Sequence, residues 1–413
     1  MLVALETHNA WPAGVLTRVP NWIYQSADIY AAEQENIFRG AAWTFLCLEI
    51  DIPRRGDYRT AALGDMPVIV VREDNRAIRA FENRCAHRGA LLAFDDGGTV
   101  EDFTCVYHNW RYDLCGNLQS IAFRNGVQGK GGMPKDFAIG ERGPRKLRVE
   151  SVCGLVFGTL SQAAPPLEEF LGEEVVARIA RVCRAPMEII GRFKQTLPNN
   201  WKLFMENTRD SYHASLLHVF FTTFRLNRLS QRGGLMVSKT GAHSVSWSAL
   251  DKAPSASAEY NAEQLRADKK DFLLADPSLI EGFDEFGDGI TLQVISIFPG
   301  CAFAQVQNTI AVRRIVPKGL DQTEVFWTYL GFRDDTREQR RIRLKQSNLI
   351  GPAGLVSLED GIIGNFVQRG IAGAAAFDTI VEMGGDAVES TDTRASEASI
   401  RGFWKIYRRL MGI

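Results

Sequence analysis

The chain lacks a long hydrophobic run, a strong net charge and an even set of cysteines. None of its apolar stretches approaches the roughly 20 residues that a membrane-spanning helix needs, so we expect no membrane segment. The formal net charge is -1, which gives no electrostatic reason to expect nucleic acid or an acidic membrane as a partner. Residues 1–20 do not combine a basic start with an apolar stretch, so no signal peptide is expected. The seven cysteines are therefore expected to be reduced thiols or metal ligands in the cytoplasm.

The first part of the chain predicts a helical segment followed by a small all-β domain. Residues 22–38 are rich in Ala and Glu, so we expect residues 1–39 to form an N-terminal helical segment. Over residues 40–162 the sequence pattern changes to short strand-like runs separated by turns with Gly and Asn. These runs are residues 68–71, 78–81, 104–107 and 155–157.

The second part, residues 163–413, mixes strand-like and helical segments. Strand-like runs recur between residues 291 and 332, and helical patterns at residues 337–349 and 396–411 close the chain. This order predicts an α+β domain with an antiparallel sheet. The Ser- and Ala-rich stretch at residues 253–258 is expected to be a mobile insertion.

Four residues of the expected β domain form a C-x-H, seventeen-residue, C-x-x-H array: Cys85, His87, Cys105 and His108. Two thiolates and two imidazoles can bind zinc, or a [2Fe–2S] cluster whose thiolates hold one iron and whose imidazoles hold the other. Many zinc fingers supply both cysteines first and both histidines later, from a helix. Here each half supplies one of each, so two similar loops can clamp opposite sides of one cluster. The order favours the [2Fe–2S] cluster, with structural zinc as the alternative.

A second candidate metal site lies at residues 199–218, which read NNWKLFMENTRDSYHASLLH. His213 and His218 with one carboxylate would make the 2-His-1-carboxylate triad that binds mononuclear Fe(II) and leaves positions open for O₂. The two histidines are five residues apart, about 140° around an ideal helix. We therefore expect the helix to end or distort near His218.

The carboxylate of this triad is left open by the residues themselves. Asp210 lies three residues before His213, on the same helical face. Glu359 and Asp360 lie far downstream, and neighbouring helical residues point about 100° apart, so only one of that pair should bind a metal. Asp210 and Asp360 are equally good candidates on this evidence.

The two motifs together, C-x-H-x17-C-x2-H and then E-N-x-x-D-x-x-H-x4-H, resemble those of the large (α) subunits of Rieske non-haem iron aromatic-ring-hydroxylating dioxygenases. The resemblance extends over essentially the whole chain. It implies a Rieske [2Fe–2S] domain at residues 40–162, with Cys85 and Cys105 on one iron and His87 and His108 on the other. It also implies a helix-grip catalytic domain at residues 163–413.

The same resemblance implies that His213, His218 and Asp360 bind the mononuclear iron, with Asn207 close to it. Asp210 is then expected to connect a cluster histidine of one subunit with an iron-binding histidine of the next. Such an electron path implies a ring of three large subunits, with three small β subunits (α3β3) or without them (α3). A separate reductase would supply electrons from NAD(P)H. The spacing from Asn207 to Asp210 is one residue shorter than in one branch of the family.

Within this family the chain is similar to the branch that acts on aromatic carboxylates. Four stretches carry this similarity, at residues 210–231, 310–318, 349–373 and 401–411. We expect dihydroxylation of terephthalate to its cis-1,2-dihydrodiol. Hydroxylation of an aromatic monocarboxylate, salicylate or anthranilate, is the alternative enzyme function. A Rieske electron carrier without mononuclear iron is a remote alternative from another class.

A carboxylate substrate needs cationic anchors, and the planar fork of arginine fits a carboxylate. Arg313 and Arg314 lie next to each other on a strand-like run and should face opposite sides of a sheet. By resemblance, Arg313 points into the pocket and Arg394 joins it, while Ser246 or Ser248 could donate a further hydrogen bond. The expected apolar walls are Leu216, Phe220, Val294, Ile297 and Phe366.

Overall fold

The computed structural model describes residues 11–12, 14–73, 77–249, 260 and 262–413. The expected mobile insertion at residues 253–258 lies outside these ranges. The chain divides into two compact units, Phe38–Leu167 and a second unit that joins the described residues before it to Glu168–Ile413. Within the described ranges, no helix is both long enough and apolar enough to cross a bilayer.

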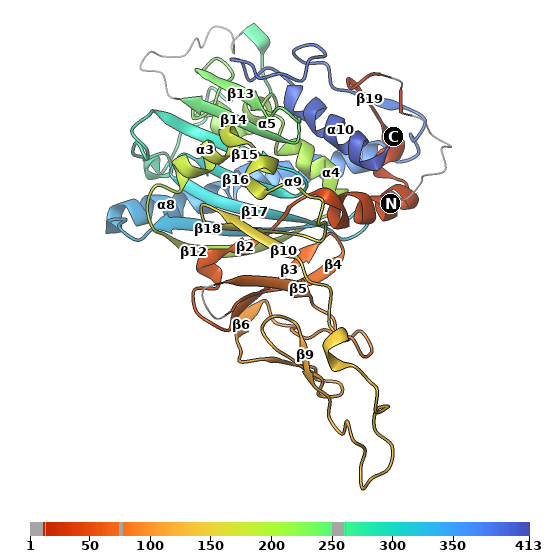
Figure 1. Cartoon of the computed structure of the whole chain (residues 1–413). Coiled ribbons are helices and arrows are strands. Elements are labelled where there is room, and N and C mark those ends of the chain that lie inside the picture. Colours follow the sequence, from red (N-terminus) through yellow and green to blue (C-terminus); the bar gives the residue numbers. More distant parts are fainter. Residues whose placement is uncertain (1–10, 13, 74–76, 250–259, 261) are drawn as a thin grey trace. The chain divides into compact units, whose positions relative to one another are not determined.

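The unit Phe38–Leu167 consists of three small antiparallel sheets made of short strands (Figure 1). The first has the order β10 (Arg148–Val152), β11 (Leu155–Thr159) and β2 (Thr44–Leu48). The second has the order β5 (Ile78–Glu82), β4 (Met66–Arg72), β3 (Asp57–Leu63) and β6 (Gly97–Thr99). The third has the order β7 (Phe103–Thr104), β8 (Arg111–Tyr112) and β9 (Leu118–Ser120). The predicted small all-β domain is confirmed.

One predicted strand of this unit, residues 104–107, is wrong beyond its first residue. β7 ends at Thr104, and Val106 and Tyr107 are turn residues with 68% and 54% of their surface exposed. Val and Tyr favour strands when one face of the strand can be buried. Here the backbone turns back at once, because the Asn109 N–H donates to the Cys105 carbonyl at 2.9 Å.

The second unit contains one seven-stranded antiparallel sheet, which confirms the predicted α+β class. Its order is β12 (Met187–Leu197), β18 (Thr323–Phe332), β17 (Thr309–Pro317), β16 (Cys301–Val306), β15 (Ile290–Ile297), β14 (His243–Ala249) and β13 (Gly233–Val237). A row of directly paired residues crosses it through Ala311, Ala304, Val294 and Ser246. Paired residues share a face of the sheet, so these short side chains leave room above its centre.

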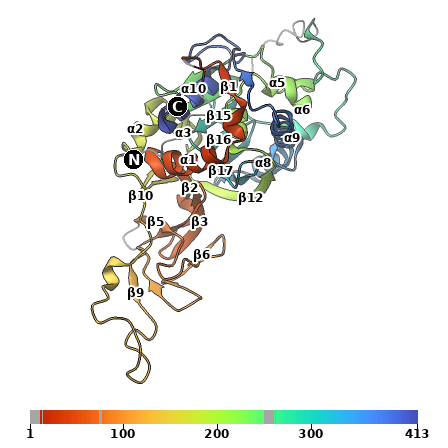
Figure 2. The ribbon, with the colours of Figure 1, turned by 90° about the vertical axis from the view of Figure 1, so that its right-hand side faces the viewer.

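Helices surround this sheet (Figure 1, and Figure 2 for the side view). Those that contact its strands are α3 (Glu173–Val182), α4 (Trp201–Asn207), α8 (Arg337–Ile350), α9 (Leu355–Gly370) and α10 (Ala398–Met411). The short helices α5 (Ala214–Leu217) and α6 (Val219–Thr223) follow α4. The predicted helix at residues 22–38 is present in three pieces: a 3-10 turn at Asn21–Tyr24, α1 (Ala27–Glu33) and a π-helical turn at Gln34–Ala41. A short pair, β1 (Arg18–Pro20) with β19 (Asp378–Ile380), lies in the same unit.

Polar contacts hold α4, the helix that leads into the second metal motif. Lys202 Nζ lies 2.6 Å from Glu33 Oε1, and both side chains are buried. Glu206 Oε1 accepts hydrogen bonds from the Tyr24 hydroxyl at 2.7 Å and from Trp404 Nε1 at 2.6 Å. These bonds tie α4 to the N-terminal segment and to α10, so the start of the metal motif has a defined place in the unit.

Candidate metal centres and substrate cavity

The two halves of the first metal motif lie on turns of the same shape. The Gly89 N–H donates to the Cys85 carbonyl at 3.0 Å, and the Asn109 N–H donates to the Cys105 carbonyl at 2.9 Å. Gly89 and Asn109 both have positive φ, 77° and 52°, a conformation that Gly and Asn adopt more readily than other residues. Each turn therefore presents one cysteine and one histidine in the same way, as the spacing predicted.

Burial separates the four candidate ligands into two pairs. Cys85 and Cys105 are each 1% exposed, whereas His87 is exposed and His108 is half-buried. Burial raises the pKa of Cys85, and its neighbour Cys105 adds to that effect. The ring centroids of the two histidines lie 4.5 Å apart. This donor set fits a mixed-ligand [2Fe–2S] cluster, which the two thiolates would hold from the buried side and the two imidazoles from the exposed side.

Two aromatic residues support this arrangement. The Trp110 ring stacks on His87 at 4.8 Å with the ring planes 6° apart, so it covers one face of that imidazole. The Tyr112 hydroxyl lies 3.2 Å from Cys85 Sγ and accepts a hydrogen bond from the Ala86 N–H at 2.9 Å. Hydrogen bonds to ligand sulfur tune the potential of such a cluster. Sequence reasoning missed Tyr112, because its contact with Cys85 depends on how β8 packs.

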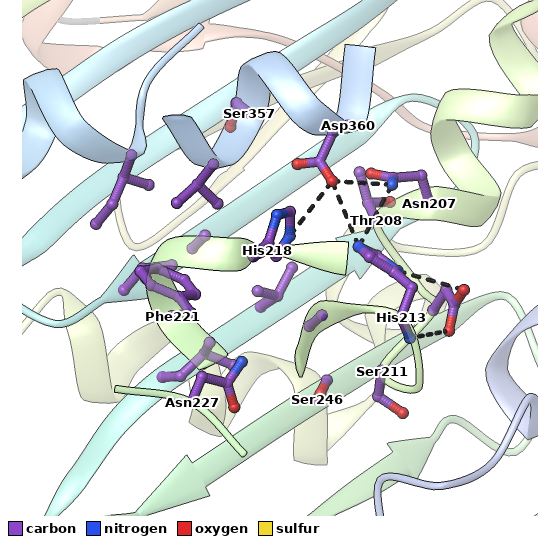
Figure 3. A pocket seen from close by; sticks show the side chains of 18 of the residues that line it. Asn207, Thr208, Ser211, His213, His218, Phe221, Asn227, Ser246, Ser357 and Asp360 are labelled. Carbon is purple, nitrogen blue, oxygen red and sulfur yellow. Dashed lines mark hydrogen bonds and ion pairs between the residues drawn. The ribbon is translucent and has the colours of Figure 1, made fainter. Parts of the chain in front are cut away.

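His213, His218 and Asp360 come together in the second unit (Figure 3). Asp360 Oδ1 lies 3.4 Å from His213 Nε2 and 3.5 Å from His218 Nε2, and all three ligand atoms lie within 4.8 Å of one another. Ligands bound about 2 Å from a single ion are about 3–4 Å apart, so the three fit one metal ion. Asn207 Nδ2 donates to Asp360 Oδ1 at 3.1 Å, which agrees with its expected place near the iron.

The helix between the two histidines is interrupted, which confirms the prediction. α5 ends at Leu217, His218 has an extended backbone with φ −78° and ψ 96°, and α6 begins at the next residue. Asp210 Oδ1 starts the turn by accepting hydrogen bonds from the Tyr212 and His213 N–H groups at 2.8 and 3.1 Å. The break turns His218 to the same side as His213.

Close packing of α9 brings Asp360 to the two histidines. Gly364 faces Asn199 at the start of α4, where an added Cβ would lie 2.3 Å from Asn199 Nδ2. An added Cβ on Gly361 would lie 3.0 Å from the Leu197 side chain. A Cβ at Gly364 would require the buried Asn199 amide to move, so this glycine favours the close approach that places Asp360.

Each histidine also has a second carboxylate partner, on the opposite side of its ring. His213 Nδ1 lies 3.3 Å from Asp210 Oδ2, and His218 Nδ1 lies 2.8 Å from Glu359 Oε2. Carboxylates in this position set the tautomer of a metal-binding imidazole and orient it. The geometry thus favours Asp360 over Asp210 as the ligand. It also gives Glu359 a role that sequence reasoning, which weighed it only as a ligand, did not find.

The charges of this site are balanced for a cation. Burial by itself lowers the pKa of His213, but the carboxylates of Asp210 and Asp360 raise it to about 10. Burial by itself raises the pKa of Asp360, but His218 and His213 hold it well below its usual range. A metal ion can replace the proton on His213, because the same carboxylates stabilise either positive charge.

A cavity adjoins this triad, and its floor is the row of short residues across the sheet. Ala311, Ala304 and Val294 line the floor. The other apolar and aromatic lining residues are Ala214, Phe221, Leu292, Val306, Trp327, Ile350 and Val356. Of the expected apolar walls only Val294 lines this cavity, and the prediction is wrong for Leu216, Phe220, Ile297 and Phe366. Phe366, for example, lies on the exposed side of α9, with 54% of its surface in solvent.

The structure places Arg313, Arg394 and Ser246 in the cavity lining, and Ser248 is not part of it. Arg313 is 8% exposed and lies 5.0 Å from the ring of Trp327, its directly paired residue on β18. Arg394 is 2% exposed, and burial lowers its pKa to about 10, so it keeps its charge at neutral pH. Arg313 and Arg394 are thus two buried cations in one cavity.

Arg314 differs from its neighbour, as expected from strand geometry. Its guanidinium lies 4.6 Å from the ring of Phe326, and it is not among the residues that line the cavity. Sequence reasoning did not find the polar lining residues Thr309 and Asn227. Thr309 lies outside the stretches that carry the family similarity. Asn227 lies within residues 210–231, but no spacing marks it as a site residue, so its place in the lining follows from the packing of the unit.

In a comparison with known proteins, one family model matches the region of the small β unit and another matches the region of the seven-stranded sheet. The model of the Rieske [2Fe-2S] domain matches residues 42–129, and that of the ring hydroxylating alpha subunit (catalytic domain) matches residues 180–413. The chain is 54% identical to a terephthalate 1,2-dioxygenase terminal oxygenase component subunit alpha 2 of Comamonas sp, covering 97% of both chains.

Two further relatives and one solved structure agree with these matches. The chain is 41% identical to an anthranilate 1,2-dioxygenase large subunit of Burkholderia cepacia, covering 96% of this chain and 94% of the relative. It is 37% identical to a salicylate 5-hydroxylase large oxygenase component of Ralstonia sp, covering 97% and 96%. The crystal structure of a naphthalene 1,2-dioxygenase from Rhodococcus sp. has the same fold, with a TM-score of 0.79 at 22% identity, covering 95% of this chain and 94% of that one.

Proposed function

The chain belongs to the family of ring-hydroxylating dioxygenase alpha subunits, and on this premise we propose that it dihydroxylates terephthalate, an aromatic ring with a carboxylate at each end. The observation that carries the proposal is the pair of buried cations, Arg313 and Arg394, in one cavity with the iron-binding triad. Arg313 lies on β17, while Arg394 lies beside Gly233 at the start of β13, on the far side of three intervening strands. A monocarboxylate would leave one buried cation without a carboxylate to pair with, which is costly, whereas a dicarboxylate pairs with both.

Oxygenases of this class carry a Rieske [2Fe–2S] cluster and a mononuclear iron, and a reductase supplies electrons from NAD(P)H. When bound, the cluster and the iron supply the electron transfer and the O₂ activation. We assign the cluster to residues 40–162 and the iron to residues 163–413, with residues 1–39 as an N-terminal helical segment. The residues that would hold the cluster are Cys85, His87, Cys105 and His108. Those that would hold the iron are His213, His218 and Asp360.

The proposed reaction converts terephthalate, O₂, NAD(P)H and one proton into the cis-1,2-dihydrodiol and NAD(P)⁺. Both oxygen atoms stay in the product, and the two electrons come from the hydride of NAD(P)H. Arg313 and Arg394 hold the two carboxylates, and Ser246 offers a further hydroxyl from the floor. The ring lies on the apolar floor around Ala304 and Ala311, which keeps water away from the ring carbons.

We propose that Asp210 connects His213 with the cluster of a neighbouring subunit. Asp210 lies 3.3 Å from His213 and keeps 22% of its side chain exposed, so a partner can reach it. In the cluster unit, His87 is exposed and His108 is half-buried, which suits contact with another chain. The corresponding assembly is a ring of three large subunits with three small β subunits, or α3 alone. Light scattering should give the mass of such an oligomer, and a monomer with full turnover would contradict it.

We also propose a cytoplasmic location, in keeping with cysteines that are all free thiols in the described chain.

The decisive experiment on function supplies the holoenzyme with a reductase and NAD(P)H and offers terephthalate, salicylate and anthranilate separately. Chromatography of the products should show a cis-dihydrodiol of terephthalate with matching O₂ uptake. Turnover of salicylate or anthranilate without any turnover of terephthalate would contradict the proposal. A protein that contains only the two cluster irons would instead be an electron carrier.

A further inference from the structure

Asn227 is an amide in the wall of the substrate cavity, 1% exposed, in the loop between α6 and β13. Arg394 Nη1 donates a hydrogen bond to Asn227 Oδ1, and Arg394 Nη2 donates to the carbonyl of Arg228. A guanidinium has only donors, so the amide must turn its oxygen towards Arg394. This contact fixes the orientation of the amide and directs Nδ2 away from the guanidinium.

Two donors of this pair have no acceptor in the part of the chain that the structure describes. They are Asn227 Nδ2 and Arg394 Nε, and both atoms are buried. A buried donor without an acceptor costs free energy, so two of them in one cavity wall point to an acceptor that arrives with a ligand. Figure 3 shows Asn227 well away from Asp360, with His218 and Phe221 between them in that view. The acceptor would therefore lie at the end of the cavity that is distant from the metal ligands.

We infer that Asn227 Nδ2 binds an oxygen of one substrate carboxylate, whose charge the neighbouring Arg394 guanidinium offsets, and that Asn227 is a specificity-determining residue. This inference rests on the proposed function, since it assigns the contacts of a carboxylate that the proposed substrate carries. Both oxygens of a carboxylate are acceptors, so either one can accept the hydrogen bond from Nδ2. The other carboxylate is left to Arg313, whose guanidinium is supported by the ring of Trp327.

The Asn227 amide distinguishes between ligand groups by their hydrogen-bonding character, which a cation alone does not do. An N–H that needs an acceptor penalises a ligand that presents its own N–H at that point, because two donors would then face each other without a partner. A carboxylate is favoured because its oxygens carry no hydrogen and can accept the hydrogen bond from this N–H. Asn227 therefore selects for a second carboxylate against a neutral group of the same shape that carries hydrogens on nitrogen.

The test compares the wild-type holoenzyme with Asn227→Asp, which keeps an oxygen for Arg394 and replaces only the outward donor by an acceptor. Dissociation constants are measured without O₂ for terephthalate and for 4-carbamoylbenzoate, in which a carboxamide replaces one carboxylate. In the variant we expect terephthalate binding to weaken at least tenfold. We expect 4-carbamoylbenzoate binding to improve, because its NH₂ group can donate to the new carboxylate, so the order of preference inverts.

Two results would overturn the inference: unchanged terephthalate binding by Asn227→Asp, or an unchanged ratio of the two dissociation constants. Asn227 would then serve only to hold Arg394. If Asn227→Asp does not fold, Asn227→Ser is tested in its place, since its shorter side chain cannot reach the carboxylate. Terephthalate binding about tenfold weaker than that of the wild type is expected. Binding equal to that of the wild type would overturn the inference. Failure of the proposed function appears separately, as a wild-type enzyme that does not bind terephthalate at all.

Discussion

Glu359 Oε2 lies 2.8 Å from His218 Nδ1, while Asp360, the next residue of α9, faces Nε2 of the same imidazole at 3.5 Å. The two carboxylates reach different sides of the ring because neighbouring helical residues diverge by about 100°. A carboxylate on Nδ1 keeps the proton there, which leaves the lone pair of Nε2 free for a metal. In the proposed site, two adjacent residues would thus supply one ligand and orient another.

Asp360→Ala should remove the mononuclear iron, about one ion per chain, and leave the cluster in place. Glu359→Gln should retain the iron but weaken its binding by about 10–100-fold, since only the outer partner of His218 is altered. Iron determination together with the visible absorption of the cluster separates the two variants. Full iron content in Asp360→Ala would rule out Asp360 as a ligand.

Asp210→Asn removes a charge but keeps an oxygen that can accept the Tyr212 and His213 N–H groups. Both metal centres should therefore remain, while turnover falls by about 10–100-fold because the link from His213 towards the neighbouring cluster is weakened. The measurement is the rate at which the reduced cluster is reoxidised when substrate and O₂ are added. Wild-type reoxidation would show that electrons take another route.

Cys105→Ser should abolish the cluster absorption, since Cys105 is one of the two buried thiols of the quartet. The matched control is Cys115→Ser. Cys115 Sγ donates to Glu73 Oε1 at 2.8 Å, so this thiol already has another partner and its loss should leave the cluster spectrum intact. A cluster lost equally in both variants would mean that the loss reflects general instability.

Arg313→Leu should raise KM for terephthalate by about 10–150-fold, the range expected when one charge-assisted hydrogen bond of about 1.5–3 kcal/mol is lost. Arg314→Leu is the matched control, because its side chain packs on Phe326 and not in the cavity lining. Its KM should stay near the wild-type value. Equal effects of the two variants would contradict the assignment of Arg313 as a substrate anchor.

Glu206→Gln should alter how stability depends on pH. Burial raises the pKa of Glu206 from 4.5 to about 7, so the unfolded chain ionises at lower pH than the folded one. The stabilising contribution of the protonated acid is complete below pH 4.5 and is lost as pH rises to about 7, by up to roughly 3 kcal/mol before solvent screening. Thermal unfolding at pH 5 should be similar for both proteins, and at pH 8 the variant should unfold at the higher temperature. A variant less stable at pH 8 would contradict this.

Local patterns were sufficient for much of this protein. The cluster quartet could be predicted because each Cys–His pair lies on one tight turn, and the two turns supply equivalent residues. The interruption at His218 could be predicted because helical geometry does not place residues five apart on one face. The opposite faces of Arg313 and Arg314 followed from the period of a strand. The prediction of a strand at residues 104–107 was wrong because these residues form the turn that presents Cys105, despite the β propensity of Val and Tyr.

Contacts between distant residues were decided only by the tertiary structure. The residues alone left Asp210 and Asp360 as equal candidates, and the packing of α9 at Gly364 brought Asp360 to the two histidines. Asn227 and Arg394 are 167 residues apart and belong to no shared motif. Their contact depends on the register of β13 and on the loops around it, and a periodic pattern carries no information on how such segments meet. The sequence by itself thus determined which metals and which chemistry the chain can support, and the packing decided which side chains face the substrate.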